Sequence, residues 1–173
     1  MKNTYLLPLA LALLVACKAK PKVNFSVPDT THFAYHKDST YQWEINPDTK
    51  NVTVALNALK AEEKLDTAGL EKCFDNNVEV YADGSHFKGS INEFAKVMQK
   101  QLEPLKSSEI KMNDWESVIN KDKTEEWVTI RYSQYFNYKS GKRDSVEYSD
   151  DMRFNNGKIG LIREYAMHFP KAK

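Results

Sequence analysis

The chain has 173 residues, of which 41% are hydrophobic and 12% are aromatic, and it contains only six glycines and six prolines. This composition argues against a disordered chain and indicates enough apolar surface for one folded domain. The 25 basic and 24 acidic residues nearly cancel and leave a formal net charge of +1. Such a balance gives no indication of a nucleic-acid partner or of a strongly acidic substrate.

An apolar segment at the N-terminus predicts export and anchoring. It runs almost unbroken from Thr4 to Ala16, after the positive start Met1–Lys2, and small residues precede Cys17. A permanent membrane helix needs about 20 apolar residues, so the segment is better interpreted as a cleaved secretory signal. The segment also resembles a bacterial lipobox, in which the cysteine is diacylated before cleavage in front of it.

That resemblance implies a lipoprotein signal peptide over residues 1–16 and a lipid on Cys17. The lipid would make the membrane of the bacterial cell envelope the first partner of the protein. Lys18, rather than an aspartate, follows the cysteine. By resemblance to known sorting behaviour, this indicates the outer membrane rather than the inner one.

Residues 17–45 are predicted to be the lipidated cysteine and a tether without a clear hydrophobic period, and residues 46–173 the folded domain. With Cys17 lipidated, Cys73 has no intramolecular partner, which excludes a disulfide framework. Cys73 is therefore predicted to be a small buried side chain on a helix. No histidine or acidic residue stands at a spacing that predicts a metal site, and no cofactor is implied.

Three helices are predicted in the first half of the domain. The first follows Asn46–Asp48, where apolar residues recur at helical spacing, and the second is a short helix capped by Asp66. Ser90 and Glu93 form a capping box that opens the third helix, and Pro104 ends it.

Strands are predicted between and after these helices. Residues 78–81 and 86–88 form a hairpin, and the period then changes from helical to alternating. Helices followed by a run of antiparallel strands predict an α+β fold, with the helices covering one face of the sheet. The long strands of this run, joined as a meander, are predicted over residues 108–119, 125–138, 144–154 and 158–169.

The last hairpin has a predicted register. Asn156-Gly157 favours a two-residue turn, which pairs Phe154 with Ile159 and continues through apolar and aromatic pairs. The same register places Asp150 directly opposite Arg163 in this apolar row. A carboxylate and a guanidinium are then expected on the face that carries Tyr148 and Tyr165.

The preceding strand allows two orientations. A tight turn at Ser140-Gly141 would bring Arg131 beside Asp150, with Trp127 on the same face. The opposite face of that strand, which includes Tyr132, is more apolar, and a one-residue bulge or an odd-length loop would exchange the two faces. Both orientations stay open from the sequence.

Two interpretations of Asp150 and Arg163 follow. They form either a structural ion pair, partly buried or exposed, or the polar floor of a ligand pocket. The candidate pocket residues are Asp150, Arg163, Tyr148, Tyr165, Arg131 and Trp127. An arginine partner would lower the pKa of Asp150, which disfavours a role as a base and favours ligand positioning. A dyad of His86 with Asp83 near the pocket mouth is weighed against an ordinary surface loop, which is the favoured interpretation.

Residues from about 48 to 169 resemble the nuclear transport factor 2-like superfamily, particularly its SnoaL-like branch. The resemblance implies a cone-like α+β fold, in which a strongly bent antiparallel sheet wraps around about three N-terminal helices and leaves an apolar cavity. It also implies frequent homodimers through the outer sheet face. The stretches that carry the resemblance are Leu65-Asp66, Val78–Tyr81 with Asp83-Gly84, Gly89–Ile91, Glu126–Val128 and Asn156–Ile159.

This superfamily includes steroid isomerases, dehydratases, polyketide cyclases and epoxide hydrolases, beside members that only bind or scaffold. The sequence favours a lipid-anchored, non-catalytic domain that binds a small apolar or amphipathic molecule. The alternative is a membrane-tethered dimerisation or protein-docking module. A further alternative is an isomerase- or dehydratase-type enzyme using Asp150 with Tyr148 or Tyr165, which requires that Arg163 does not neutralise Asp150.

Overall fold

The computed structural model describes residues 34–35 and 42–168. The chain divides into two units, Met1–His36 and Lys37–Lys173, and the second contains every helix and strand described below. The predicted signal peptide, Cys17 and most of the predicted tether lie outside the described residues. None of the helices described is both long and apolar enough to cross a membrane.

The described residues form three helices, and each matches a helix predicted from the sequence. Helix α1 (Lys50–Glu63) buries an apolar face that includes Ala55, which is completely inaccessible to solvent. Helix α2 (Thr67–Glu71) begins after Asp66, whose side chain accepts a hydrogen bond of 2.9 Å from the Gly69 amide. This bond satisfies one of the amides that a helix N-terminus leaves unpaired.

Helix α3 (Ile91–Leu102) opens with the predicted capping box. The Ser90 hydroxyl accepts a hydrogen bond from the Glu93 amide, and the Glu93 carboxylate accepts one of 2.8 Å from the Ser90 amide. Phe94 and Leu102 are the buried residues of this helix. The capping box therefore fixes where α3 begins, and burial of its apolar residues holds it on the sheet.

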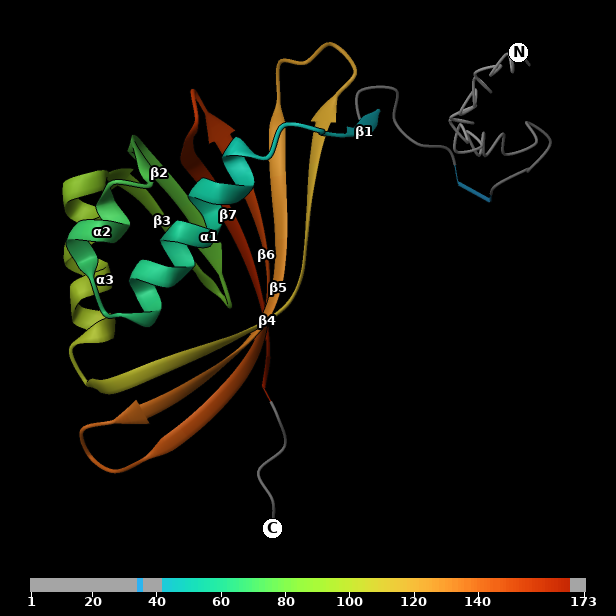
Figure 1. Cartoon of the computed structure of the whole chain (residues 1–173). Helices are drawn as coiled ribbons and strands as arrows, with labels where there is room; N and C mark the ends of the chain where they lie inside the picture. The colour runs from blue at the N-terminus through green and yellow to red at the C-terminus, as the bar shows by residue number, and fades with distance from the viewer. Residues whose placement is uncertain (1–33, 36–41, 169–173) are drawn as a thin grey trace, which may run out of the picture. The chain divides into compact units, whose positions relative to one another are not determined.

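The described residues also form one seven-stranded sheet, with strand order β1-β4-β5-β6-β7-β2-β3 (Figure 1). The hairpin β2–β3 and the meander β4–β7 confirm the strands predicted from the sequence. The strands are β1 (Trp43–Ile45), β2 (Phe74–Ala82), β3 (Ser85–Ser90), β4 (Leu105–Asn120), β5 (Glu126–Tyr138), β6 (Arg143–Asn155) and β7 (Lys158–His168).

Two features of the sheet differ from the prediction. Strand β2 pairs with β7 in parallel, so the sheet is mixed and mostly antiparallel rather than purely antiparallel. Strand β1 pairs with β4 although its residues, 43–45, fall in the range assigned to the tether. A three-residue strand is too short to show a period in the sequence, and its pairing partner is distant in the chain.

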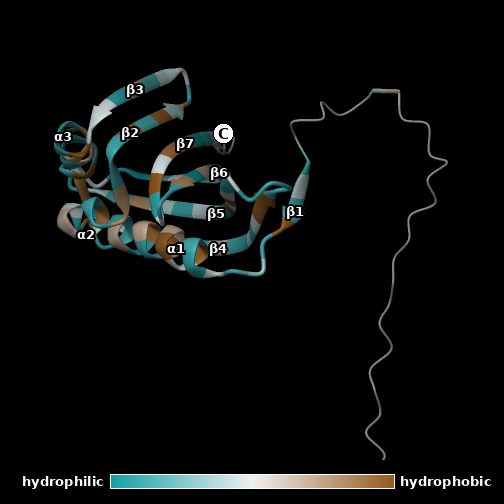
Figure 2. Cartoon of the chain, turned by 90° about the horizontal axis from the view of Figure 1, so that it is seen from above, coloured by the Kyte–Doolittle hydropathy of each residue, from teal (hydrophilic) through white to brown (hydrophobic). Residues whose placement is uncertain are grey.

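The three helices lie against one face of the sheet, and the long strands curve around them (Figure 1). Hydrophobic and hydrophilic bands alternate along these strands (Figure 2), as expected for a sheet with one covered face. Val128, Ile130 and Ile159 are completely buried between the layers. Each such side chain contributes roughly 1.5–3 kcal/mol relative to an exposed position.

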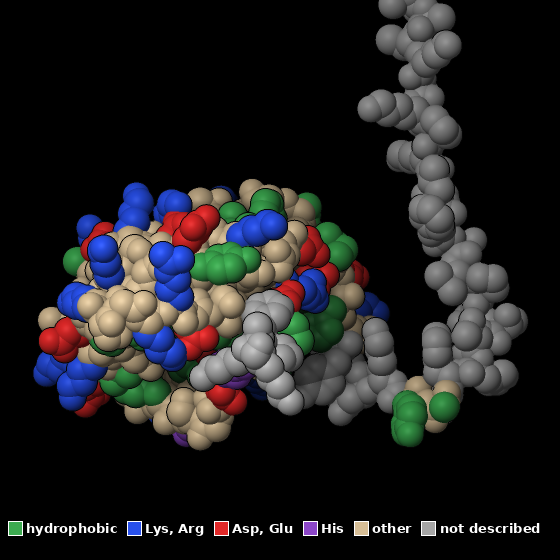
Figure 3. Space-filling model, turned by 90° about the horizontal axis from the view of Figure 1, so that it is seen from below, with side chains coloured by type: hydrophobic (Ala, Val, Ile, Leu, Met, Phe, Trp, Pro, Cys, Tyr) green, Lys and Arg blue, Asp and Glu red, His purple; other side chains and the backbone are tan. Residues whose placement is uncertain are grey.

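The opposite face of the sheet carries mixed polar, charged and aromatic side chains. On β5, alternate residues from Trp127 to Tyr135 occupy this outer face, because Val128, Ile130 and Tyr132 are the buried ones. Seen from below, Lys and Arg side chains are interspersed with Asp and Glu over the domain (Figure 3).

The orientation of β5 settles the alternative that the sequence left open. Asn137 pairs with Arg143, which leaves an odd number of residues between the two partners. Arg131 therefore lies opposite Ser149 rather than Asp150. The more apolar face of β5 is the covered one, because burying it removes the larger apolar area from water.

A bulge shifts the register of the last hairpin. The predicted pair Phe154 and Ile159 is present, but the next pair is Arg153 with Leu161, so Gly160 is the extra residue. A Cβ at Gly160 would meet the side-chain amide of Asn155, and glycine leaves room for that amide. Every residue of β7 beyond Gly160 consequently lies one position away from its predicted partner.

Candidate functional site

A cavity of about 290 Å³ lies between the helices and the covered face of the sheet. Side chains from all three helices and from β2 to β7 line it, and most of them are apolar or aromatic. Three lining residues, Ser85, Val97 and Gln101, are exposed, so the cavity opens to solvent beside α3. Its buried apolar walls include Leu59, Leu70, Phe74, Phe94, Met152 and Ile162.

Three acidic side chains line the same cavity. Asp150 comes from β6, Glu164 from β7 and Glu62 from α1. Asp150 and Glu164 are direct partners across the two strands, so both face the helices. No lysine, arginine or histidine is among the lining residues that the structure describes. The cavity is thus apolar in its walls and acidic in its polar part.

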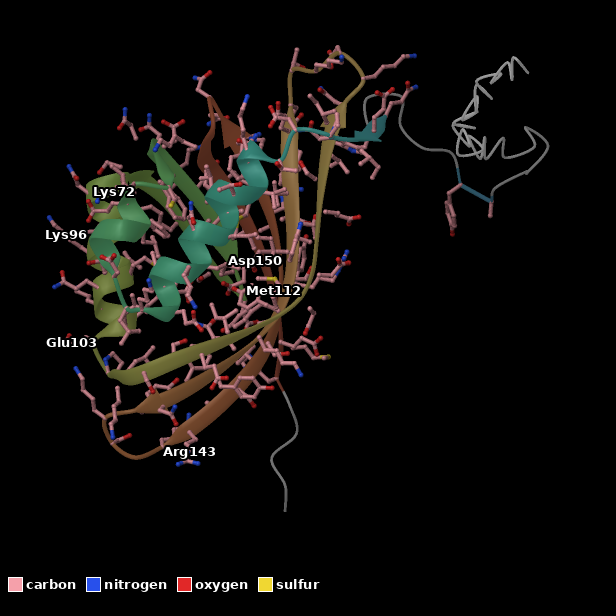
Figure 4. All side chains as sticks on the ribbon, in the orientation of Figure 1. Lys72, Lys96, Glu103, Met112, Arg143 and Asp150 are labelled. Atoms are coloured by element: carbon pink, nitrogen blue, oxygen red, sulfur yellow. The ribbon has the colours of Figure 1, made fainter. Side chains whose placement is uncertain are left out.

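Asp150 is the most buried of these acids, with 3% of its surface exposed, and it lies between the helix layer and the sheet (Figure 4). The Tyr132 hydroxyl donates a 3.0 Å hydrogen bond to Asp150 Oδ2, whereas Oδ1 is buried without a partner. Burial, together with the charge of Glu164, raises the pKa of Asp150 well above its usual value. The site therefore favours a neutral carboxylic acid that can donate a hydrogen bond from Oδ1.

Glu164 also has a raised pKa. Burial, reinforced by the negative charges of Glu62 and Asp83, raises the pKa of Glu164 to about 7. Burial also raises the pKa of Glu62, although the Gln134 amide donates a 3.1 Å hydrogen bond to its carboxylate. Near neutral pH, the cavity therefore holds exchangeable protons on closely spaced carboxyl groups.

Two tyrosines complete the polar part of the site. Tyr148 lines the cavity, and its ring stacks on that of Tyr132 with centroids 5.3 Å apart. Burial raises the pKa of Tyr132 and the pKa of Tyr148 above the usual phenol range. Both groups are therefore neutral hydroxyls, suited to donating hydrogen bonds rather than to removing protons.

The predicted opposition of Asp150 and Arg163 is wrong. Because of the bulge at Gly160, Arg163 lies opposite Asp151 on the outer face of the sheet. Its guanidinium stacks over the Trp127 ring, 5.2 Å from the ring centroid. Neither Arg163 nor Trp127 is among the cavity lining, and Asp150 has no basic partner there.

Arg131 and Tyr165 also lie on the outer face. Arg131 forms ion pairs with Asp114 at 3.5 Å and Glu116 at 3.3 Å. Tyr165 is 58% exposed. Of the six predicted pocket residues, the structure brings together only Asp150 and Tyr148 in the cavity.

The weighed dyad of His86 and Asp83 is not formed. His86 lies 3.1 Å from the Glu79 carboxylate, and its ring stacks on Tyr81 with centroids 4.4 Å apart. Asp83 instead lies 3.4 Å from His168. His86 is exposed, which agrees with the favoured surface interpretation.

Cys73 is buried, as predicted, but it does not lie on a helix. Cys73 is buried just after α2, and burial raises the pKa of its thiol. Among residues 34–35 and 42–168, no group of three histidine, cysteine or acidic side chains is arranged to hold a metal ion.

Sequence reasoning missed Glu62, Glu164 and Tyr132. A glycine inside a strand pattern is a recognised sign of a bulge, so Gly160 carried the signal that would have turned Glu164 inward. Tyr132 was on the more apolar face of its strand, which itself predicted burial. Glu62 had no local signal, because a charged residue near a helix end is normally solvated.

Comparison of the structure with solved proteins identifies the fold. AusH from Aspergillus nidulans is 17% identical, with 72% of this chain and 87% of that one covered and a TM-score of 0.57. An epoxide hydrolase from M. tuberculosis is 14% identical, with coverages of 70% and 86% and a TM-score of 0.56. A nuclear transport factor 2-like protein of unknown function from Burkholderia pseudomallei is 10% identical, with coverages of 68% and 91% and a TM-score of 0.56.

These likenesses establish that the domain has the nuclear transport factor 2-like fold. No protein-family model and no curated protein sequence matches the chain. The identities are low, so the likenesses define the architecture and leave the chemistry to the residues of the cavity.

The raised pKa of Glu164 makes the stability of the domain depend on pH. The pKa of Glu164 is about 7 in the folded domain, above its ordinary value of 4.5. The folded state thus holds a proton that the unfolded chain releases, and the wild type loses stability as pH rises through this interval. Glu164→Gln removes the loss, so its stability relative to wild type should increase by up to about 3 kcal/mol between about pH 5 and about pH 8.

Urea unfolding at the two pH values measures this difference. Glu109→Gln, an exposed position on β4, is the matched control and should follow the wild type. Equal pH dependence in wild type and Glu164→Gln would contradict the buried, proton-retaining state of Glu164.

Proposed function

We propose that this domain binds a small, largely apolar molecule in the cavity and orients it through Asp150. The observation that carries the proposal is Asp150, a buried acid that lines the 290 Å³ cavity and whose Oδ1 has no hydrogen-bond partner. A buried polar atom without a partner costs about 1–3 kcal/mol, and a ligand hydroxyl or carbonyl at this position would recover that energy. Tyr148 supplies a second neutral hydroxyl beside it.

The shape of the site supports a small-molecule ligand rather than a protein partner. Ligand sites are concave and mostly apolar, with a few converging polar groups, and volumes near the low end of about 300–1,000 Å³ suit small ligands. One solved protein of this fold is named an epoxide hydrolase, a catalyst that acts on small molecules. In a pure docking module the interior would be filled, and here it is open.

The proposal places the domain at the cell envelope. A lipid on Cys17 and a tether would hold it at a membrane, with the outer membrane favoured by Lys18. The SnoaL-like branch stays a prediction, as does the homodimer. The outer sheet face, where Tyr165 and Met167 are more than half exposed, is the surface that such a dimer would use.

Binding of a neutral probe tests the proposed function. Naphthylmethanol combines a flat apolar body with one hydroxyl, and it should raise the melting temperature of the domain. At about tenfold excess over its dissociation constant, the stabilisation amounts to about 1.4 kcal/mol. Ala82, which lines the cavity beside Glu164, offers a blocking variant, Ala82→Leu, which should remove the shift.

Ala68→Leu, at an exposed position of α2, is the matched control and should retain the shift. If naphthylmethanol fails to stabilise the wild type, or if it stabilises Ala82→Leu equally, the cavity is not the binding site.

Glu164 favours a second candidate function, which is catalysis by proton transfer. A carboxyl group with a pKa of about 7 is well matched to general acid–base work near neutral pH. An enzymatic role requires that Arg163 does not neutralise Asp150. Arg163 lies opposite Asp151 on the outer face and does not line the cavity, so this requirement is met. Asp150 and Tyr148 would then donate hydrogen bonds to the developing negative charge.

A benzisoxazole probe tests this candidate. The Glu164 carboxylate takes the C3–H proton of the isoxazole ring, the C–H electron pair completes a nitrile, and the N–O bond breaks to leave a phenolate. The rate should rise as pH increases through about 7, and Glu164→Gln should lower it about a hundredfold. If Glu164→Gln is as active as the wild type and as the Glu109→Gln control, proton transfer by Glu164 is ruled out and the ligand-binding proposal still stands.

The anchor has its own test. Expressed in a bacterium and labelled with an alkynyl fatty acid, the wild-type protein should incorporate label and fractionate with membranes, and Cys17→Ser should do neither. Cys73→Ser is the matched control, because Cys73 is buried inside the folded domain. This substitution should leave labelling unchanged. Equal labelling of wild type and Cys17→Ser would contradict lipidation at Cys17.

A further inference from the structure

The charges of the cavity are one-sided. Glu62, Asp150 and Glu164 enter it from α1, β6 and β7, and no basic side chain lines it among the residues described. Buried charges are normally paired, and a cluster of like charges in an apolar surrounding is costly to ionise. The residues that the structure describes therefore supply no positive partner for these acids in the cavity.

An independent observation indicates that the partner is a ligand. Asp150 is more than nine-tenths buried, and its Oδ1 has no hydrogen-bond partner although Oδ2 accepts from Tyr132. The Gln134 amide donates a hydrogen bond to Glu62 and holds it in place. Asp150 and Glu62 are thus positioned by the protein, and one oxygen of Asp150 is left without a hydrogen-bond partner.

Aromatic rings surround the same space. Phe74 and Phe94 pack with ring centroids 5.0 Å apart, Phe87 packs on Phe94 at 5.4 Å, and all three line the cavity with Tyr148. The faces of such rings attract cations, most strongly where water is excluded. Acids combined with aromatic rings match a cation that carries an apolar body.

From this arrangement we propose that the cavity selects a hydrophobic organic amine, bound as its ammonium ion. The inference rests on the proposed function and names its ligand class. The ammonium group donates a hydrogen bond to Asp150 Oδ1 and neutralises Glu164, while the apolar body fills the space among the phenylalanines. A small metal ion would leave that apolar space empty, and a carboxylate ligand would add a further negative charge.

Binding of the ammonium ion is coupled to proton release. The groups that act on Glu164 and Asp150 are Glu62 from α1, Tyr132 from β5, Tyr148 and Asp151 from β6, and Asp83 from the β2–β3 turn. Asp83 lies 3.4 Å from His168, and none of the described residues that line the cavity is basic. A bound cation favours the ionised carboxyl groups, so binding displaces protons from them. Affinity should therefore rise as pH increases through about 7.

The experiment compares three matched probes by calorimetry: naphthylmethylamine, naphthylmethanol and naphthoate. Near pH 8 the amine should bind at least about tenfold more tightly than the alcohol, because a charge-assisted hydrogen bond contributes more than a neutral one. Near pH 6 its binding should release about one proton, measured in buffers of different ionisation enthalpy. Naphthoate should not bind.

Isosteric variants locate the effect. Asp150→Asn and Glu164→Gln should each abolish the preference, so that the amine binds no more tightly than the alcohol to the same variant. Asp151→Asn is the matched control, since Asp151 lies on the outer face of the same strand, where it accepts a hydrogen bond from Thr129. The control should keep the full preference.

The outcomes separate the two proposals. Equal or tighter binding of the alcohol overturns the amine inference and leaves the proposed function standing. Failure of both the alcohol and the amine to bind overturns both. A preference that survives in Asp150→Asn and Glu164→Gln, or that is lost in Asp151→Asn, overturns the assignment of amine recognition to the cavity acids.

Discussion

The bulge at Gly160 determines which charges face the interior of this domain. One extra residue in β7 turns Arg163 outward and Glu164 inward, because side chains on a strand alternate between faces. Without it, Asp150 would have a guanidinium opposite it and a lowered pKa. With it, every charged side chain that lines the cavity in the described part of the chain is acidic. A local backbone irregularity thus sets the electrostatics of a site formed by six strands and three helices.

Desolvation then decides how these acids behave. Apolar walls and helix packing remove water from Asp150 and Glu164, so protons are retained where charges would be costly. Tyr132 donates a hydrogen bond to Asp150 and Gln134 donates one to Glu62, so both carboxyl groups are held in place. The remaining capacity, above all Asp150 Oδ1, stays free for a ligand. A domain built only for stability would gain by filling this cavity with apolar side chains.

Local signals made most of the fold predictable. The capping box of Ser90 and the Asn-Gly turn before β7 each act within a few residues, and both formed as predicted. The parallel pairing of β2 with β7 and the arrival of Glu62 in the cavity depend on contacts distant in the chain. Alternation along β6 placed Asp150 and Tyr148 on one face, and these are two of the five polar residues of the site. The position of Glu164 depends on the register of β7 against β6, which the bulge at Gly160 shifts by one residue.

The central claim is that the cavity acids retain protons near neutral pH, and carbon-13 NMR of the carboxyl groups tests it most directly. Difference spectra against Asp150→Asn and Glu164→Gln assign the two resonances. Glu164 should titrate near pH 7, and Asp150 should titrate far above the ordinary aspartate value of 3.8. Titration of both groups below about pH 5 would contradict a desolvated, unpaired acidic cavity.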